Sequence, residues 1–237
     1  MDARPNDEDD EPTMVLLIRS YNRPEYLRTT LESILASDVH RCTKRYIYDD
    51  GSERVETLRL LSDPAYVEVP TKEFVVLRNA ANVGCKQSYV QALAHVKRDN
   101  LGANTLVCTV DNDVVVKKDF IAVLTREYAK ARSLFRTTDL LLTGFNPTNA
   151  HANRIEDHAT FYRKETCGGV NFVFHIDFLD FIAQHWGENL DFGVNYAMHA
   201  QNMPLLCLQT SVLNHIGAFG LWSHGPERVD TDAHFVA

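Results

Sequence analysis

The sequence lacks the features that mark membrane-spanning and disulfide-bonded chains. No apolar run among its 237 residues approaches the roughly 18 residues that a transmembrane helix needs. There are only 5 cysteines and no Cys-x-x-Cys pair, which favours reduced thiols over a disulfide framework or a zinc site; they are Cys42, Cys85, Cys108, Cys167 and Cys207. These absences predict a soluble protein of a reducing compartment, the cytoplasm.

The chain is also short of positive charge, with a net charge of −8 at pH 7. This balance argues against binding nucleic acid or an anionic membrane through bulk charge. It does not exclude a nucleotide, because a metal ion and a few local cations can hold its phosphates.

Residues 1–13 are acidic and contain proline, and they lack the basic region and apolar core of a signal peptide. We expect them to be disordered. Residues 14–237 are long enough to bury a core, and the hydrophobic content of the chain, 45%, is ordinary for a globular protein. They predict a single domain.

Apolar β-type runs alternate with segments of helical spacing through the first part of the chain. Asn22 and Glu25 fit a capping box for the first helix, and Pro24 is tolerated in its first turn. Strands are predicted at residues 14–18, 45–48, 74–77, 105–110 and 140–143. This alternation predicts an α/β fold with a mostly parallel central sheet and helices on both faces.

The second half is less regular. Residues 151–166 are polar and rich in His and Arg, and the spacing of His151, Arg154 and His158 fits no metal-ligand motif. We expect an irregular, solvated loop there. Further along, the pattern predicts strands at 168–174, 205–208 and 211–213, helices at 177–185 and 191–201, and a flexible segment at 215–220.

Four polar clusters lie at the ends of the predicted strands, where ligands of such sheets bind. They are residues 19–23, 49–52, 78–84 and 111–113. Asp111 and Asp113 would repel each other at a buried strand end unless a cation neutralises them, and carboxylates suit Mg²⁺ or Mn²⁺. The alternative is that one of them is a turn residue or a cap for the segment that starts at Lys118.

The order and spacing of these clusters resemble the nucleotide half of family 2-like glycosyltransferases with the GT-A (Rossmann-like) fold. The resemblance rests on Ile18–Leu27 (IRSYNRPEYL), Tyr48–Ser52 (YDDGS), Asn82–Gly84 (NVG) and Val110–Val114 (VDNDV). It implies a nucleotide-binding half at residues 14–135 and a smaller acceptor-side half at 136–237, which matches the family only loosely.

The resemblance also implies a nucleotide site. Tyr21 would lie against uracil, and Arg19 and Ser20 would line the base pocket with main-chain groups. Asp49 or Asp50 would accept the pyrimidine N–H, unless both only shape an Asp-Gly turn. The remaining candidate contacts are Asn82, Lys86 beside the phosphates, Asp111 and Asn112. Tyr21 as a plain loop aromatic and Lys86 as a solvated lysine are the alternatives.

For the metal, the resemblance implies that Asp113 is a direct ligand and that Asp111 contacts the ribose or orders water. His215, within Asn214–Gly217 (NHIG), resembles the distal histidine ligand of several GT-A enzymes, and His224 is the reserve. A loop histidine with no ligand role is the alternative for His215. The metal would stabilise the leaving diphosphate as a Lewis acid.

An inverting enzyme of this kind needs a carboxylate base, which the family usually carries in a Glu-Asp pair. The matching stretch, residues 186–192 (WGENLDF), has no such pair. Asp191 is the first candidate and Glu188 the second, with a helix N-cap as the alternative role of Asp191. Trp186 is either a sugar platform or a core residue.

The implied function is metal-dependent, inverting transfer of a hexose from a UDP-sugar (glucose, galactose or L-rhamnose type) to a glycan or another hydroxyl acceptor. One rival is a catalytically inactive nucleotide-sugar-binding module. The other is a sugar-nucleotide pyrophosphorylase, which needs a glycine-rich loop after the first strand; residues 19–23 contain no glycine.

Overall fold

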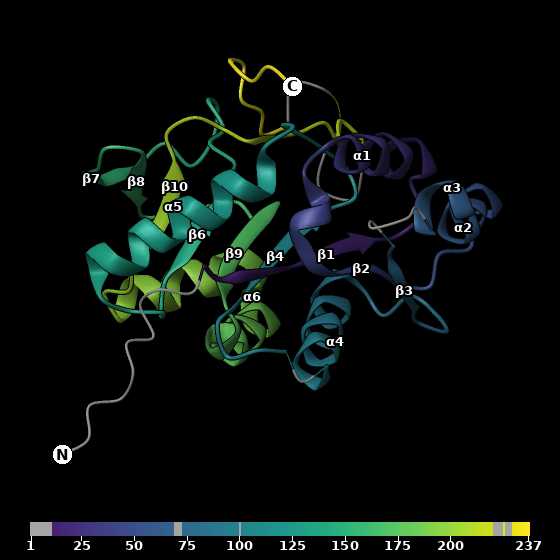
Figure 1. The fold of residues 1–237 in the computed structure, drawn as a ribbon, viewed down its shortest axis with the longest axis horizontal. Helices are drawn as coiled ribbons and strands as arrows, with labels where there is room; N and C mark the ends of the chain where they lie inside the picture. The colour runs from purple at the N-terminus through teal and green to yellow at the C-terminus, as the bar shows by residue number, and fades with distance from the viewer. Residues whose placement is uncertain (1–10, 69–72, 100, 220–224, 226–228) are drawn as a thin grey trace.

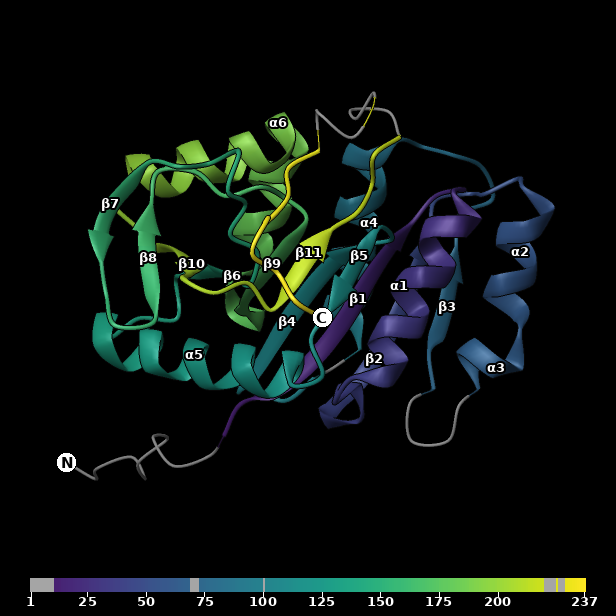
Figure 2. The ribbon, with the colours of Figure 1, turned by 90° about the horizontal axis from the view of Figure 1, so that it is seen from above.

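The computed structural model describes residues 11–68, 73–99, 101–219, 225 and 229–237. Within them a nine-stranded sheet runs through the molecule in the order β3-β2-β1-β4-β9-β6-β10-β8-β7. Figure 2 shows β7 and β3 at the two ends of this sheet and β1 and β4 near its middle. The α/β fold predicted from the sequence is confirmed.

The first half of the chain builds the parallel part of the sheet. Its strands are β1 (Thr13–Ser20), β2 (Cys42–Asp49), β3 (Val75–Arg78) and β4 (Thr105–Asp111). β1 lies between β2 and β4, and all three pairings in this part are parallel. β1 and β4 read as continuous apolar runs because both of their faces are covered by helices.

The second half makes the sheet mixed. β9 (Asn171–His175) runs antiparallel to both β4 and β6 (Leu141–Thr143), while β10 (Leu205–Leu208) is parallel to β6. The irregular loop predicted at residues 151–166 is wrong, because β7 (Arg154–Asp157) and β8 (Phe161–Lys164) form an antiparallel hairpin there. Its exposed strand β7 hides the usual apolar pattern.

A second, two-stranded sheet pairs β5 (Val114–Val116) with β11 (Leu213–His215). β5 follows the Asp pair directly, so this pairing places the C-terminal part of the chain against it. The flexible segment predicted from residue 215 is therefore wrong at its start, since His215 is a strand residue opposite Val114. Residue 220, where that prediction ended, lies outside the described residues.

Helices cover both faces of the large sheet, as Figure 1 shows. One apolar cluster joins the sheet to α1 (Pro24–Ala36), α2 (Val55–Ser62), α3 (Pro64–Val67) and α5 (Phe120–Phe135). The other joins it to α4 (Cys85–Arg98) and α6 (Leu179–Ala200). Two short 3₁₀ turns, η1 (Val39–Arg41) and η2 (Ile176–Phe178), complete the described elements.

The capping box predicted for the first helix is wrong. The N-cap of α1 is Arg23, in the left-handed conformation with φ 57°, and it makes no side-chain cap hydrogen bond within the described residues. Asn22 caps a different helix, because its Oδ1 accepts from the backbone N–H groups of Glu53 and Arg54 at the start of α2. Pro24 occupies the first turn as expected.

The long range of α6 contains two helical segments, as the sequence predicts, although the first begins at Leu179. Asn189 (φ −150°) and Leu190 (φ 55°) are non-helical and break it in the middle. A Cβ added to Gly193 would lie 2.1 Å from the carbonyl oxygen of His185, so glycine is required where the segments meet. The break matters because Asp191 begins the second segment.

Residues 1–10 of the predicted disordered tail lie outside the described residues, and Thr13, its last residue, already belongs to β1. All 5 cysteines are free thiols, of which only Cys85 is exposed. In the described part of the chain, none of the helices combines the length and the apolar character that a membrane crossing requires.

Glu127 of α5 supplies a pH-dependent part of the stability. It is 3% exposed, and its carboxylate accepts a hydrogen bond from Thr160 Oγ1 at 2.6 Å. Arg126 Nε and Lys130 Nζ also donate to this carboxylate, both at 2.9 Å. Burial by itself raises the pKa of Glu127, but these hydrogen bonds outweigh it and hold the pKa below its usual 4.5. The stabilisation is therefore present above pH 4.5 and is lost as pH falls through the lower folded value.

We expect Glu127→Gln to lower the free energy of unfolding at pH 7 by about 2 kcal/mol. The difference from the unaltered protein should shrink to nothing as pH falls below the folded pKa of Glu127. Urea unfolding at pH 7, 5 and 3 measures it, with Glu53→Gln on the exposed surface as control. A difference that stays constant over this pH range would contradict the ionised role of Glu127.

Candidate active site

The polar clusters at the strand ends meet at one edge of the sheet. Strand register places Ser20 beside Asp49 and Asp49 beside Arg78, and it places Arg19 beside Asp111. These are the carboxyl ends of neighbouring parallel strands, the usual ligand-binding edge of such a sheet. The convergence expected from the sequence is therefore present for these four strands.

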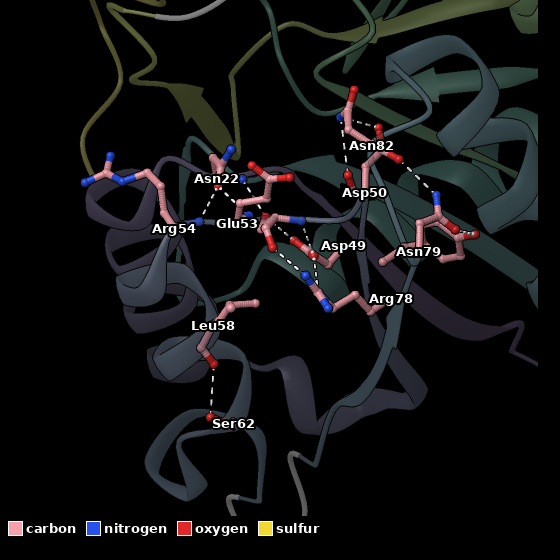
Figure 3. A network of polar contacts seen from close by, with 12 residues as sticks. Asn22, Asp49, Asp50, Glu53, Arg54, Leu58, Ser62, Arg78, Asn79 and Asn82 are labelled. Atoms are coloured by element: carbon pink, nitrogen blue, oxygen red, sulfur yellow. Dashed lines mark hydrogen bonds and ion pairs between the residues drawn. The ribbon is translucent and has the colours of Figure 1, made fainter.

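Asp49, at the end of β2, is completely buried. Its carboxylate accepts from the backbone N–H of Ser52 at 2.9 Å, from Ser52 Oγ at 2.5 Å and from Arg78 Nε at 3.2 Å (Figure 3). Asp49 thus ties the ends of β2 and β3 together. Arg78, which is less buried, covers this carboxylate on the side of β3.

Asp50 organises the loop after β3. Its side chain accepts from the side-chain amides of Asn79 and Asn82 and from the backbone N–H groups of Val83 and Gly84, at 2.8–3.0 Å (Figure 3). This arrangement holds Asn82 beside the end of β2. Asp50 thus has a structural role in this loop, and the next residue of the chain shows why it must be followed by glycine.

Gly51 has φ 69°, and a Cβ there would lie 2.3 Å from the backbone carbon of Ala81. Only glycine tolerates both the backbone conformation and this close approach. The same region contains Asn22, whose backbone N–H donates to Ser52 Oγ at 2.6 Å. Asn22 therefore fastens the loop after β1 to the loop after β2, a role that sequence reasoning missed.

Arg19 holds Asp111. Its guanidinium Nη2 lies 2.5 Å from Asp111 Oδ1 and donates to the carbonyl oxygen of Gly169 at 2.6 Å. The guanidinium also lies 4.6 Å from the ring centre of Tyr89 and 4.7 Å from that of Trp186. Burial raises the pKa of Asp111 to about 6, although the charge of Arg19 opposes this rise.

Trp186 is 3% exposed and packs edge-on against Tyr89, with ring centres 4.3 Å apart. It is a core residue that supports Arg19, and its buried ring is not available as a platform for a sugar. Lys86 lies near the start of α4, as expected, and donates to the carbonyl oxygen of Glu188 at 2.7 Å.

Asp113 joins three parts of the chain that are far apart in sequence. Its Oδ2 accepts from Arg23 Nη1 at 2.6 Å and lies 3.1 Å from His215 Nε2. A Cβ added to Gly217 would lie 2.0 Å from the same oxygen, so the segment after β11 approaches as closely as glycine permits. Sequence reasoning left Arg23 without a role of its own; its place in the polar cluster that follows β1 was the available signal.

The charges in this cluster are complementary. Burial raises the pKa of Asp113, but the hydrogen bond from His215 and the charges of His215 and Arg23 outweigh it and lower the pKa. Burial by itself lowers the pKa of His215, but the hydrogen bond to Asp113 and the charge of Asp113 outweigh this effect and raise the pKa. Asp113 is therefore held as an ionised carboxylate by Arg23 and His215.

The donor set of this cluster fits a divalent cation. Asp113 is 3% exposed, and its Oδ1 has no hydrogen-bond partner among the residues described; the same holds for His215 Nδ1. In that part of the chain no group of three His, Cys, Asp or Glu side chains could hold a metal by itself. Mg²⁺ and its relatives commonly use one or two protein ligands together with substrate phosphates, so two protein donors suffice.

Asp191 starts the second segment of α6. Its Oδ2 accepts from the backbone N–H of Gly169 at 3.0 Å, and its Oδ1 from that of Phe192 at 3.1 Å. Gly169 donates to Asp191 with its N–H and accepts from Arg19 with its carbonyl, so one residue links Asp191 to the Asp111 side of the cleft. Trp186 leaves no room for a Cβ at Gly169.

The remaining sequence candidates have simple placements. Glu188 is exposed and its Oε2 lies 3.0 Å from His185 Nδ1. Tyr21 is 43% exposed at the end of β1, whereas Ser20 is buried. Asn112 is 6% exposed and approaches the backbone of Asn22. His224 lies outside the described residues.

The fold is of the GT-A type. The chain belongs to glycosyl transferase family 2, whose model matches residues 16–175. The family resemblance read from the four motifs is thereby confirmed. An N-acetylglucosaminyltransferase of Rhizobium leguminosarum bv. phaseoli is 30% identical over 123 residues, which are 52% of this chain and 27% of that protein.

Solved structures share the fold at low sequence identity. GalNAc-T7, determined with UDP, GalNAc and Mn²⁺, has a TM-score of 0.66 and 16% identity, over 91% of this chain and 45% of that one. Mannosyltransferase PcManGT from Pyrobaculum calidifontis, in complex with GDP-Man and Mn²⁺, has a TM-score of 0.55 and 13% identity, over 84% and 55%. S. aureus TarS 1–349 has a TM-score of 0.60 and 14% identity, over 87% and 61%.

The chain spans less than two thirds of each of these proteins. At such identities the structural likeness shows the fold alone, and the substrates named for these proteins are not assigned to this chain.

Proposed function

We propose that this chain is a metal-dependent, inverting glycosyltransferase that moves a hexose from a UDP-sugar to a hydroxyl of a glycan or similar acceptor. The observation that carries the proposal is the meeting of Arg23, Asp113 and His215 at the carboxyl edge of the sheet. A buried carboxylate with one unpartnered oxygen, beside an imidazole, supplies an oxygen and a nitrogen donor for Mn²⁺ or Mg²⁺.

Asp113 and His215 would hold the cation, and the cation would supply charge stabilisation for the departing diphosphate. The protein's own cations add to this. Arg19 and Arg23 both lie beside the Asp pair, and each has guanidinium N–H groups with no hydrogen-bond partner in the described part of the chain. These N–H groups are donors suited to phosphate oxygens.

The nucleotide would enter between the ends of β1 and β2. Tyr21 offers a half-exposed ring for a base to stack on, and the ordered loops around Asp49 and Asp50 supply fixed hydrogen-bonding groups beside it. A donor bound there points its diphosphate along the edge toward Asp111 and Asp113. The proposal includes a preference of this site for uracil over guanine.

Asp191 would act as the base. It lies across Gly169 from Arg19, and the two backbone N–H groups that it accepts from fix the orientation of its carboxylate. In a single displacement it would take the proton of the acceptor hydroxyl while that oxygen attacks the anomeric carbon. The C–O bond to the diphosphate breaks on the opposite face, which inverts the configuration.

The same contacts also favour a second candidate, an inactive nucleotide-sugar-binding module. Both oxygens of Asp191 already accept a backbone N–H, as a purely structural cap would. Calorimetry with UDP-glucose, UDP-galactose, UDP-L-rhamnose and GDP-mannose, each with and without Mn²⁺, tests donor binding. A parallel assay of UDP release tests turnover.

We expect UDP-sugars to bind at least tenfold more tightly with Mn²⁺ than without it, and GDP-mannose to bind more weakly than they do. Slow hydrolysis of the bound donor should accompany binding. Preference for GDP-mannose would overturn the choice of nucleotide. Binding without turnover, with glycan acceptors present, would overturn the enzyme and leave the binding module.

A further inference from the structure

A pocket of about 370 Å³ lies on the acceptor side, lined by the β7–β8 hairpin, the loop after β6, Lys117 after β5, residues 209–211 before β11 and the C-terminal residues. Figure 2 shows β7 and β8 at the end of the sheet opposite β3, away from the nucleotide edge of β1 and β2. None of the Asp, His or Tyr side chains assigned to donor binding lines it. The proposed function leaves this pocket without a role.

The lining of the pocket is rich in cations. Lys117, Arg154 and Lys164 contribute three positive charges, against the one carboxylate of Asp232. This concentration stands out in a chain whose net charge is −8. For the described residues, no carboxylate oxygen lies within 4.0 Å of the charged nitrogens of these three side chains.

Lys164 is the most informative of the three. It is 3% exposed, and its Nζ donates to Asn146 Oδ1 at 2.7 Å. The ammonium group also interacts with the side chain of Cys207. A buried ammonium group loses its hydration, and a neutral amide oxygen and a thiol restore only part of that loss. Buried cations of this kind are usually paired with an anion.

The strand register adds a second argument. Arg154 on β7 stands opposite Lys164 on β8 in the antiparallel hairpin. Like charges directly opposite each other destabilise a strand pair, so this pairing costs stability in the free protein. Arg154 also lies over Tyr162, with its guanidinium 3.7 Å from the ring centre, which holds the charge at the pocket wall.

The pocket is connected to the candidate base through a short stretch of chain. Two residues after Lys164, Thr166 Oγ1 lies 2.9 Å from His151 Nδ1. A Cβ added to Gly168 would lie 3.2 Å from the other nitrogen of His151, Nε2. The next residue, Gly169, donates its N–H to Asp191. Residues 164–169 thus link Lys164 of the pocket to Asp191.

We propose that this pocket binds an oxyanion of the acceptor, with Arg154 and Lys164 as its main contacts. The acceptor class is thus an anionic glycan or glycoconjugate, whose phosphate or carboxylate sits in the pocket while a neighbouring hydroxyl reaches Asp191. That the anion belongs to an acceptor rests on the proposed function. That the pocket binds an oxyanion rests on its own residues.

The test is calorimetric titration of the full chain, first saturated with UDP and Mn²⁺ so that the donor site is filled. The probes are glycerol 3-phosphate and glucuronate, with glycerol and glucose as uncharged counterparts. Arg154→Gln and Lys164→Gln remove the two cations separately. Arg163→Gln is the matched control, because Arg163 donates to Asn202 instead of lining the pocket.

We expect an anionic probe to bind and each pocket variant to weaken binding about tenfold, with the control and the uncharged probes unaffected. The stronger of the two anions identifies phosphate or carboxylate as the preferred group. Equal binding by the pocket variants, or by the uncharged probes, would overturn the proposal. If Lys164→Gln fails to fold, Arg154→Gln on the exposed strand decides alone.

This design separates the two proposals. Failure of UDP to bind with Mn²⁺ would count against the proposed function, and the anionic probes would then be titrated into the nucleotide-free chain, where the dependence on Arg154 and Lys164 still decides the pocket. Failure of the probes in a chain that binds UDP would remove the pocket alone.

Discussion

Asp113→Asn is expected to lower metal-dependent turnover of the donor by about a thousandfold, which corresponds to about 4 kcal/mol of lost transition-state stabilisation. The amide keeps the shape of the side chain but removes the negative charge that Arg23 and His215 surround. It also removes the unpartnered carboxylate oxygen that would bind the cation. Affinity for the UDP-sugar with Mn²⁺ should fall to the value measured without it.

The measurement is UDP release and calorimetry, each over a range of Mn²⁺ concentrations. Asp119→Asn is the matched control, because Asp119 is exposed and, among the described residues, its side chain makes no cap hydrogen bond to α5. Nucleotide binding without Mn²⁺ should survive in both variants, which shows that the cleft is still folded. Undiminished Mn²⁺ dependence in Asp113→Asn would remove Asp113 from the metal site.

The sequence was most informative where local pattern and fold agree. β1 and β4 are long apolar runs buried on both faces, so their position and their parallel pairing follow from periodicity and from the alternation with helices. The polar residues at their ends were found for the same reason. A strand that must be buried leaves few positions for charge except its end.

The sequence could not show which charged side chains pair with Asp113, because its partners Arg23 and His215 lie 90 or more residues away along the chain. Arg23 meets Asp113, and Asn22 caps α2 instead of the helix next to it. A capping box describes only local competition for backbone N–H groups. Here Asn22 (φ 48°) and Arg23 (φ 57°) both have a left-handed backbone, and in the described residues the Arg23 side chain packs over Tyr26 of α1 without capping the helix.

The β7–β8 hairpin escaped sequence reasoning for a different reason. All four residues of β7 are exposed, so the strand carries no apolar alternation and its composition is that of a loop. What holds it is pairing to β8, whose own position is set by β10. The anion pocket depends on this hairpin, so no pattern within residues 151–166 could have indicated it.

Gly169 connects the two ends of the candidate reaction path. Its carbonyl fixes Arg19, which holds Asp111, and its N–H fixes Asp191. The backbone of one residue thus sets the distance between the side of the cleft that would hold the diphosphate and the group that would take the acceptor proton. Trp186 keeps this residue a glycine by filling the space of a Cβ.

Asp191→Asn is expected to lower turnover with an acceptor by about a thousandfold, within the range of 10² to 10⁴ for loss of a general base. The asparagine Oδ1 can still accept from the backbone N–H of Gly169, so the cleft and the affinity for the UDP-sugar should be preserved. The loss should therefore lie in kcat, with the KM for the donor unchanged. Release of UDP in the presence of acceptor, together with calorimetry of donor binding, measures both.

Glu188→Gln is the decisive comparison, because Glu188 is the other carboxylate that precedes the second segment of α6. It is exposed and paired with His185, away from Gly169, so its replacement should leave kcat within about twofold of the unaltered protein. If Glu188→Gln abolished turnover and Asp191→Asn did not, the base would be Glu188 and the contact of Asp191 with Gly169 would be structural. If neither change affected turnover, the base would lie elsewhere on the acceptor side. Equal loss in both would mean that the break at Asn189 and Leu190 positions the two carboxylates as one unit.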